Sequence, residues 1–222
     1  LALHALNAAL VFSFIRGLTG KNQAAFFAAL LFAVHPMQVE AVSWAAALST
    51  VLFSTFYLLS LLVYLQWRRS PALLWIVLSL AAFLAACLSK SAAVTLPLVL
   101  VAVDFYLDGK QSGKNWLSKI PYFAGALVFG LYTFVTREQE GHDIEATSAV
   151  FSMVDRFFMV CQTLLFYPFK LLVPLGYSVS YPFVKMEGAW DWTYYAAPLV
   201  LAGHLEMFLL ELAATLAREF YD

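Results

Sequence analysis

Long apolar runs separated by short polar breaks make up most of the chain. The runs cover residues 1–15, 24–34, 48–67, 72–88, 92–107 and 120–135, and the breaks contain arginine, lysine, glycine, proline or histidine. An α-helix rises about 1.5 Å per residue, so about 20 apolar residues cross the hydrocarbon core of a bilayer, and most of these runs are near that length. The pattern therefore predicts a series of transmembrane α-helices.

A short polar segment between the second and third runs has its own pattern. His35 and Pro36 end the second run, and proline suits the first turn of a helix because its missing N–H group is not needed there. We therefore expect a helix that begins at Pro36, continues to residue 47 and merges into the run at 48–67. Glu40 and Trp44 would share one face of that helix.

The chain changes character after residue 136. Residues 137–148 are polar and acidic, and residues 151–173 form an apolar segment interrupted by an aspartate, an arginine, a proline and a lysine. This segment either spans the membrane or lies in the interface as an amphipathic helix. Residues 174–192 are rich in Gly, Pro and Tyr and predict an ordered loop, and a last apolar run begins at Trp192.

This pattern divides the chain into two predicted parts. Residues 1–203 are predicted to be a transmembrane helical domain, and we expect about seven to eight spans in it. Residues 204–222 are predicted to be an amphipathic tail, with an apolar stripe formed by Leu205, Phe208, Leu209, Leu212 and Leu216. The chain opens at Leu1 inside an apolar run, so we expect that it begins within a longer protein, after an upstream helix and loop. The expected fold is an all-α, polytopic transmembrane helical bundle with interfacial helices on its outer face.

Composition supports the membrane assignment. Of the 222 residues, 63% are hydrophobic and 12% are charged, and the mean hydropathy is +0.79. Soluble domains are about half apolar and a quarter charged, so the excess apolar surface here needs lipid to cover it. A net charge of −1 gives no sign of a nucleic-acid partner, and Cys87 and Cys161 lie in apolar runs without metal-ligand spacing. We expect an integral membrane protein, in the bacterial inner membrane rather than the endoplasmic reticulum.

The distribution of lysine and arginine predicts the orientation of the helices. Basic residues concentrate in the breaks after the first, third and fifth runs, which carry Arg16, Lys21, Arg68, Arg69, Lys110, Lys114 and Lys119. The alternate breaks carry none at 35–47, then Lys90 alone, then one arginine among four acidic residues at 137–148. Cytoplasmic loops of membrane proteins hold the excess of basic residues. His35, Glu40 and Lys90 are therefore expected on the opposite, outer face.

His35 and Glu40 are the candidate catalytic residues on that face. A carboxylate and an imidazole at a membrane boundary can bind a cation, orient a sugar hydroxyl or transfer a proton. The alternative is a helix cap followed by a solvated polar turn. The sequence alone leaves both interpretations open.

Five further residues are candidates for substrate binding. Lys90 could bind a lipid phosphate, or could be an interfacial lysine whose stem lies along apolar surface. Arg137 and Glu138 follow a span; arginine suits bidentate phosphate binding, and a surface ion pair is the alternative. Tyr177 and Tyr181 could stack on a sugar ring, or could belong to the aromatic belt at the membrane surface. No residue is assigned as a metal ligand.

Four segments, taken in order and spacing, resemble the membrane portion of the transmembrane and tetratricopeptide-repeat (TMTC) family and its bacterial relatives. They read LHALNAALVFSFIRGLTG, AALLFAVHPMQVEAVSWAAALSTVLFSTFYLLSLLVYL, LSKSAAVTLPLVLVAVDFYL and FYPFKLLVPLGYSVSYPF. The most specific piece is His35-Pro36-x-x-x-Glu40-Ala41-Val42, and the Leu88-Ser89-Lys90 turn supports it. The similarity covers most of residues 1–203, and no tetratricopeptide repeat is visible in the chain.

The resemblance implies a GT-C-type glycosyltransferase, similar to the protein O-mannosyltransferases. Such an enzyme takes a sugar from a polyprenyl-phosphate carrier and transfers it to an acceptor on the outer or lumenal face. It implies a lipid-linked sugar donor and a protein acceptor or partner subunits in the lipid bilayer, and it makes a divalent cation a candidate cofactor. It also implies an acidic catalytic motif upstream of Leu1. The alternative is a non-catalytic membrane subunit that holds a larger complex together. A transporter is disfavoured because residues 1–135 place very few ionisable side chains near the membrane centre.

Overall fold

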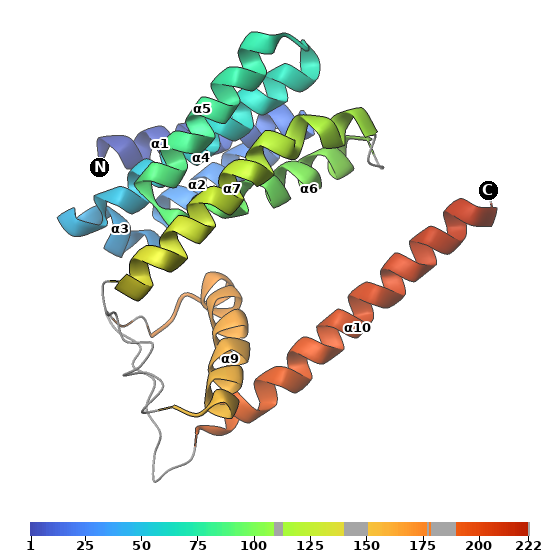
Figure 1. Ribbon diagram of the computed structural model, residues 1–222. Coiled ribbons are helices and arrows are strands. Elements are labelled where there is room, and N and C mark those ends of the chain that lie inside the picture. Colours follow the sequence, from blue (N-terminus) through green and yellow to red (C-terminus); the bar gives the residue numbers. More distant parts are fainter. Residues whose placement is uncertain (109–112, 140–150, 177, 179–189, 222) are drawn as a thin grey trace. The chain divides into compact units, whose positions relative to one another are not determined.

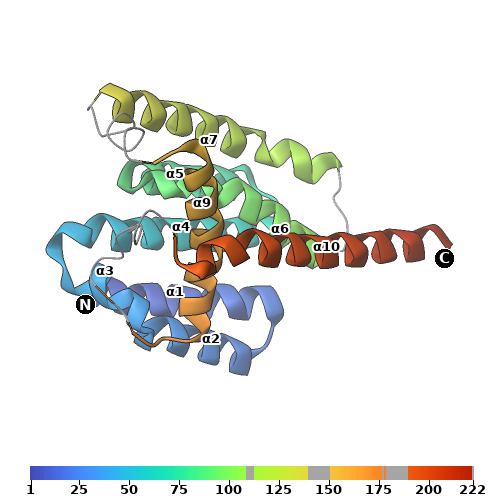
Figure 2. The same cartoon turned by 90° about the horizontal axis from the view of Figure 1, so that it is seen from below.

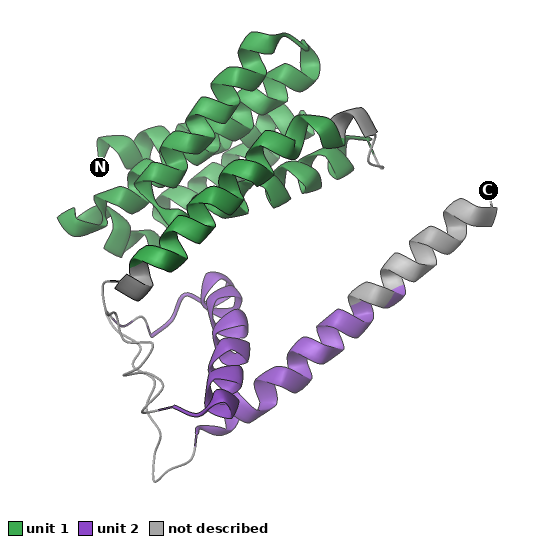
Figure 3. Ribbon diagram, viewed as in Figure 1, with its two compact units in different colours: residues 1–142 green, residues 143–222 purple. Residues whose placement is uncertain are grey.

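A computed structural model describes residues 1–108, 113–139, 151–176, 178 and 190–221, and the side chains of residues 113–115, 137–139, 208, 209 and 211–221 are outside this description. Every regular element in the described part is helical (Figure 1). The chain divides into two compact units, Leu1–His142 and Asp143–Asp222 (Figure 3), and each is described by itself. The expected all-α fold is therefore confirmed for the described residues.

The helices of the first unit follow the apolar runs of the sequence. Their bounds are α1 (Ala2–Thr19), α2 (Asn22–Val34), α4 (Leu48–Arg69), α5 (Leu73–Ser89), α6 (Leu96–Asp108) and α7 (Gly113–Gln139). Helix α1 ends because Gly20 takes a left-handed conformation (φ 71°), and its N–H group donates to the carbonyl oxygen of Arg16. Glycine adopts this conformation without a steric penalty, which makes it the usual residue just past a helix end.

The segment between α2 and α4 is not the single helix expected from Pro36. It consists of the 3₁₀ turn η1 (Pro36–Gln38), the short helix α3 (Val39–Ser43) and a second 3₁₀ turn, η2 (Ala45–Ala47). The chain bends by 52° between α2 and the η1–α3 segment. Two breaks in helical geometry cause the change: the backbone is extended at His35, before the proline, and again at Trp44 (φ −97°, ψ 118°).

Helix α4 lies at the centre of the first unit. It packs against α5 on one side and α1 on the other, α2 packs against α1, and α7 covers α5, α6 and η3 (Ser91–Thr95), as Figures 1 and 2 show. The core contains fully buried large side chains, among them Tyr64, Phe83, Leu96, Leu100 and Tyr122. The apolar faces of these helices thus meet between α4, α5, α6 and α7.

Buried polar side chains tie the neighbouring helices together. Asn7 on α1 donates to the carbonyl oxygen of Val51 on α4 (3.0 Å), and Thr55 donates to the Asn7 side-chain oxygen (2.7 Å). Ser60 on α4 and Ser79 on α5 each donate to the other's carbonyl oxygen at 2.8 Å. Small hydroxyl groups allow close helix contact and satisfy their own hydrogen bonds, as expected in an apolar surrounding.

The outer surface of the first unit is apolar. Large side chains such as Phe27 (63% exposed), Leu73 (78%) and Tyr132 (65%) lie on it. Four stretches of the described residues are long and apolar enough to cross a membrane, Ala2–Thr19, Ala45–Arg69, Ser91–Asp108 and Trp116–Thr136, and the bent α2–α3 pair makes a fifth if it counts as one span. Helix α5 is shorter and equally apolar. The chain is therefore an integral membrane protein, and the expected total of seven to eight spans stays a prediction.

The second unit contains α9 (Met153–Leu172) and α10 (Trp192–Tyr221), which pack against each other. A capping box starts α9: Ser152 and Asp155 each accept from the other's backbone N–H group. Trp190 donates from its indole nitrogen to Asp155 (2.9 Å) and stacks on Phe151 and Tyr194. The predicted boundary between residues 203 and 204 falls inside α10, and whether 151–173 crosses the membrane stays open.

Candidate functional site

Lys90 lies in the turn that joins α5 to η3. The backbone of Lys90 is extended (φ −159°, ψ 134°), which ends α5 and turns the chain into η3. Its ammonium group donates to the hydroxyl of Thr50 (2.9 Å), in the first turn of α4. The side chain is exposed. Lys90 is therefore a solvent-accessible cation held at the end of the first unit where α4 begins.

His35 and Glu40 belong to the bent segment that leads into the same end of α4. The half-buried His35 is the N-cap of η1, and its Nδ1 atom accepts a hydrogen bond from the backbone N–H of Met37 (3.2 Å). Glu40 is exposed in the first turn of α3, where a carboxylate is stabilised by the helix dipole. The capping interpretation thus holds for His35.

A cavity of about 230 Å³ adjoins this segment. Its wall includes Ala41 of α3, Trp44 at the break, Leu48 and Val51 of α4, and His4 of α1. The ring of His4 stacks on Phe32, and its Nε2 atom donates to the carbonyl oxygen of Ala33 (3.0 Å). His4 was not among the residues predicted from the sequence. The signal that could have found it is an ionisable side chain inside an apolar run.

The structure thus gathers part of the predicted set at one end of the first unit. The Lys90 turn and the His35–Glu40 segment meet α4 within its first turns, through Thr50 and through the contacts of α3 and η2 with α4. The small cavity beside α3 is lined by neither Glu40 nor Lys90. Chemically, this end offers an exposed cation, an exposed carboxylate and two imidazole rings at the boundary of an apolar bundle.

The remaining predicted residues fall outside what the structure describes. Arg137 and Glu138 lie in the last turns of α7, whose backbone is described there and whose side chains are not. Tyr177 and Tyr181 lie outside the described residues. Their predicted roles stay predictions. Among the described residues, no group of three or more His, Cys, Asp or Glu side chains is placed to hold a metal ion.

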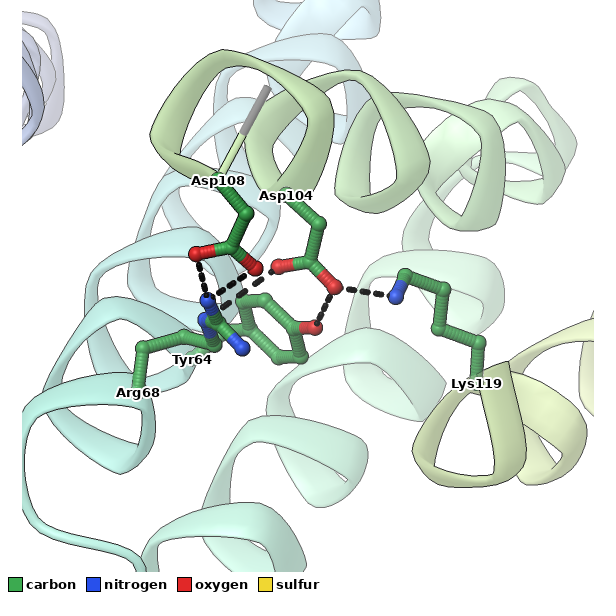
Figure 4. A network of polar contacts seen from close by, with 5 residues as sticks. All are labelled: Tyr64, Arg68, Asp104, Asp108 and Lys119. Atoms are coloured by element: carbon green, nitrogen blue, oxygen red, sulfur yellow. Dashed lines mark hydrogen bonds and ion pairs between the residues drawn. The ribbon is translucent and has the colours of Figure 1, made fainter. Parts of the chain in front are cut away.

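A charge cluster lies at the opposite end of α4, and Figure 4 shows its four charged residues together with Tyr64. Asp104 on α6 is completely buried and accepts a hydrogen bond from the hydroxyl of Tyr64 on α4 (2.9 Å). The same carboxylate forms an ion pair with Lys119 on α7, which is also completely buried. Arg68, in the last turn of α4, lies 3.4 Å from Asp104 and donates to both oxygens of Asp108 at 2.6 and 2.7 Å.

This charge cluster holds three helices of the first unit together. Asp104 has no exposed surface, and the cluster joins α4, α6 and α7 through two acidic and two basic side chains. Buried charges in apolar surroundings are tolerated only when they are paired and hydrogen-bonded. We therefore assign it a structural role, since every member is engaged by another. The packing of α7 against α6 brings Asp104 and Lys119 together.

Comparison of the chain with protein-family models, with curated protein sequences and with solved structures found no significant match.

Proposed function

We propose that the chain is the membrane core of a glycosyltransferase that moves a sugar from a polyprenyl-phosphate carrier to an acceptor on the outer face. The resemblance in the His35–Val42 and Leu88–Lys90 segments suggests the enzyme class. The Lys and Arg distribution supports the outer placement of these segments. The long apolar helices supply the surroundings that a lipid-linked donor needs.

The main structural support for this proposal is the exposed ammonium group of Lys90. Thr50 anchors it (2.9 Å) at the end of the apolar bundle, and no carboxylate among the described residues forms a salt bridge with it. The charge is thus free to interact with an anion at the membrane boundary, and the phosphate of a lipid carrier is an anion found at that depth. The Glu40 carboxylate lies in the other segment that meets this end of α4.

The reaction would be a direct displacement at the anomeric carbon of the sugar. The oxygen of the acceptor hydroxyl forms the new bond to that carbon, and the bond from the carbon to the phosphate oxygen breaks with its electron pair. The proton of the hydroxyl passes to the Glu40 carboxylate. Lys90 stabilises the negative charge of the departing polyprenyl phosphate.

The test is sugar transfer by the full-length protein in nanodiscs, with radiolabelled polyprenyl-phosphate sugars and membrane-protein acceptors. Lys90→Gln should lower the turnover about 100-fold, because it removes a group that stabilises the leaving phosphate. Glu40→Gln should lower it by a similar factor if Glu40 takes the proton, since general bases contribute about 10²–10⁴-fold.

Lys21→Gln is the matched control, because it removes an exposed lysine from the turn between α1 and α2, at the end of the first unit opposite to Lys90. It should leave turnover unchanged. Loss of transfer in all three variants would indicate general instability of the protein. An absence of transfer from the folded wild-type protein with every donor would contradict the proposal.

The second candidate is a non-catalytic scaffold subunit of a larger complex. The observation that favours it is the apolar outer surface of α7, where Leu127, Leu131 and Phe134 are more than half exposed and partner helices could replace lipid. Stable co-purification of partner subunits, together with the absence of transfer, would support this alternative.

A further inference from the structure

An open groove lies between the last turns of α1 and the first turns of α2. Its volume is about 610 Å³, and it is lined by Phe12, Arg16, Asn22, Gln23, Phe26 and Phe27. It lies at the end of the first unit that holds the charge cluster, because Arg69 of α4 donates to the carbonyl oxygen of Gly17 (2.6 Å). The groove is thus remote from Lys90 and belongs to no site described so far.

Polar side chains line one end of the groove, and aromatic side chains line the other. Arg16, Asn22 and Gln23 lie next to the α1–α2 turn, at the ends of the two helices. The phenylalanines lie one helical turn deeper: Phe12 precedes Arg16 by four residues, and Phe26 and Phe27 follow Asn22 and Gln23 by four. Residues four apart share a face of a helix. A polar mouth above an aromatic floor matches a phospholipid, whose headgroup lies at the membrane surface and whose chains lie below.

Arg16 differs from the other basic side chains at this end. Arg68 and Lys119 pair with aspartates of the charge cluster, and Arg69 donates to a backbone carbonyl. The exposed guanidinium of Arg16 forms neither an ion pair nor a hydrogen bond with any residue in the described part of the chain. No acidic residue lines the groove, so it presents one uncompensated positive charge beside two amide side chains.

We propose that this groove binds an anionic phospholipid of the leaflet that the α1–α2 turn faces. The Arg16 guanidinium binds the phosphate through two parallel N–H donors, and the amides of Asn22 and Gln23 bind the remaining headgroup oxygens. An acyl chain lies against Phe26 and Phe27, whose rings are 57% and 63% exposed. A zwitterionic lipid is disfavoured because the lining contains no carboxylate to pair with its ammonium group. A soluble phosphate would leave the aromatic floor without a partner.

The test is native mass spectrometry of the full-length protein with bound phospholipids, compared with Arg16→Gln. Wild-type protein should retain phosphatidylglycerol in preference to phosphatidylcholine. Arg16→Gln should weaken phosphatidylglycerol binding at least about tenfold, because it removes the charged hydrogen bonds to the phosphate. Phe27→Ser should weaken it as well, by removing apolar contact with the chain.

Lys21→Gln is the control for net charge, since it removes the same charge from the adjoining turn without touching the groove lining. It should leave binding within about twofold. Equal retention of the two lipids, or equal losses in Arg16→Gln and Lys21→Gln, would overturn the proposal. Displacement of the lipid by millimolar glycerol phosphate would also overturn it, because the groove would then recognise a free phosphate alone. These outcomes do not depend on sugar transfer, so they are separate from the proposed function.

Discussion

At the level of single residues, Asp104 stands out because a charged side chain is completely buried there. Its carboxylate has no exposed surface, yet it receives the hydroxyl of Tyr64, the ammonium of Lys119 and the nearby guanidinium of Arg68 (Figure 4). A buried ion pair adds little net stability compared with apolar residues of the same volume. Removal of one partner is costly, because it leaves the other charge buried without compensation.

This reasoning predicts the outcome of a double-mutant cycle on Asp104 and Lys119. Asp104→Leu should lower the free energy of unfolding by about 3–5 kcal/mol, because it leaves the buried Lys119 charge uncompensated. Lys119→Met should lower it by less, because Arg68 remains 3.4 Å from the Asp104 carboxylate and Tyr64 still donates to it. The double variant should recover most of that loss, since neither charge remains to be paired. The measurement is reversible unfolding of the protein in mixed detergent micelles.

Asp108→Asn is the matched control within the same cluster. Its ion pair with Arg68 is partly exposed, with 34% of the Asp108 side chain accessible. Exposed pairs contribute about 0–1 kcal/mol, so this variant should change the stability by no more than that. Losses that simply add in the Asp104 and Lys119 double variant would contradict the assigned pairing.

At the scale of the element, the close approach of α7 to α5 depends on a glycine. A Cβ atom at Gly125 would lie 3.0 Å from the Cε1 atom of Phe83, which is completely buried and in contact with Tyr122. Phe83 belongs to the buried core, where its ring packs against Tyr122, so a shift of Phe83 would disturb that packing. The absence of a side chain at position 125 therefore sets the distance between the two helices.

Gly125→Leu is predicted to separate α7 from α5. It should lower the free energy of unfolding by about 1–3 kcal/mol or more, because overpacking a tight interface forces the backbone to shift. Gly130→Leu on the same helix is the control, since a Cβ atom there would meet nothing within 4 Å. It should change the stability by less than about 1 kcal/mol, through helix propensity alone. Equal losses in the two variants, measured by unfolding in detergent, would contradict the predicted contact.

At the scale of the whole molecule, the two ends of the first unit differ in charge. One end holds four basic residues, Arg16, Arg68, Arg69 and Lys119, beside two acidic ones, Asp104 and Asp108. Among the described side chains, the other end holds Glu40 and Lys90. The contacts that join α1, α4, α6 and α7 keep each set of residues at its own end. The positive-inside rule then assigns the first end to the cytoplasm.

Cysteine labelling tests this orientation in a Cys87→Ala, Cys161→Ala background. Ser43 and Ser70 are exposed, and they lie in α3 and just after α4, at opposite ends of the unit. A membrane-impermeant maleimide added to intact spheroplasts should label Ser43→Cys and leave Ser70→Cys unlabelled. Both should react after the membrane is permeabilised. The reverse pattern would place the proposed sugar-transfer site in the cytoplasm and contradict the proposed function.

The helical fold, the membrane setting and the positions of most helix ends could be predicted from the amino-acid sequence. These are local properties, since the length of an apolar run, a helix-ending glycine such as Gly20 and the placement of charges are all readable along the chain. Sequence reasoning also placed His35 and Lys90 in turns, and the structure confirms those positions. It did not foresee the break at Trp44, because nothing in the local pattern opposes a continuous helix there.

Only the tertiary structure decided which polar groups meet. Asp104 pairs with Lys119 from the next helix, Lys90 with Thr50 forty positions away, and Arg16 finds no partner among the described residues. Each outcome depends on helix packing, which brings distant positions within hydrogen-bonding reach and leaves others apart. In apolar surroundings an unpaired charge is costly, so these pairings separate the structural cluster around Asp104 from the free cations at Lys90 and Arg16.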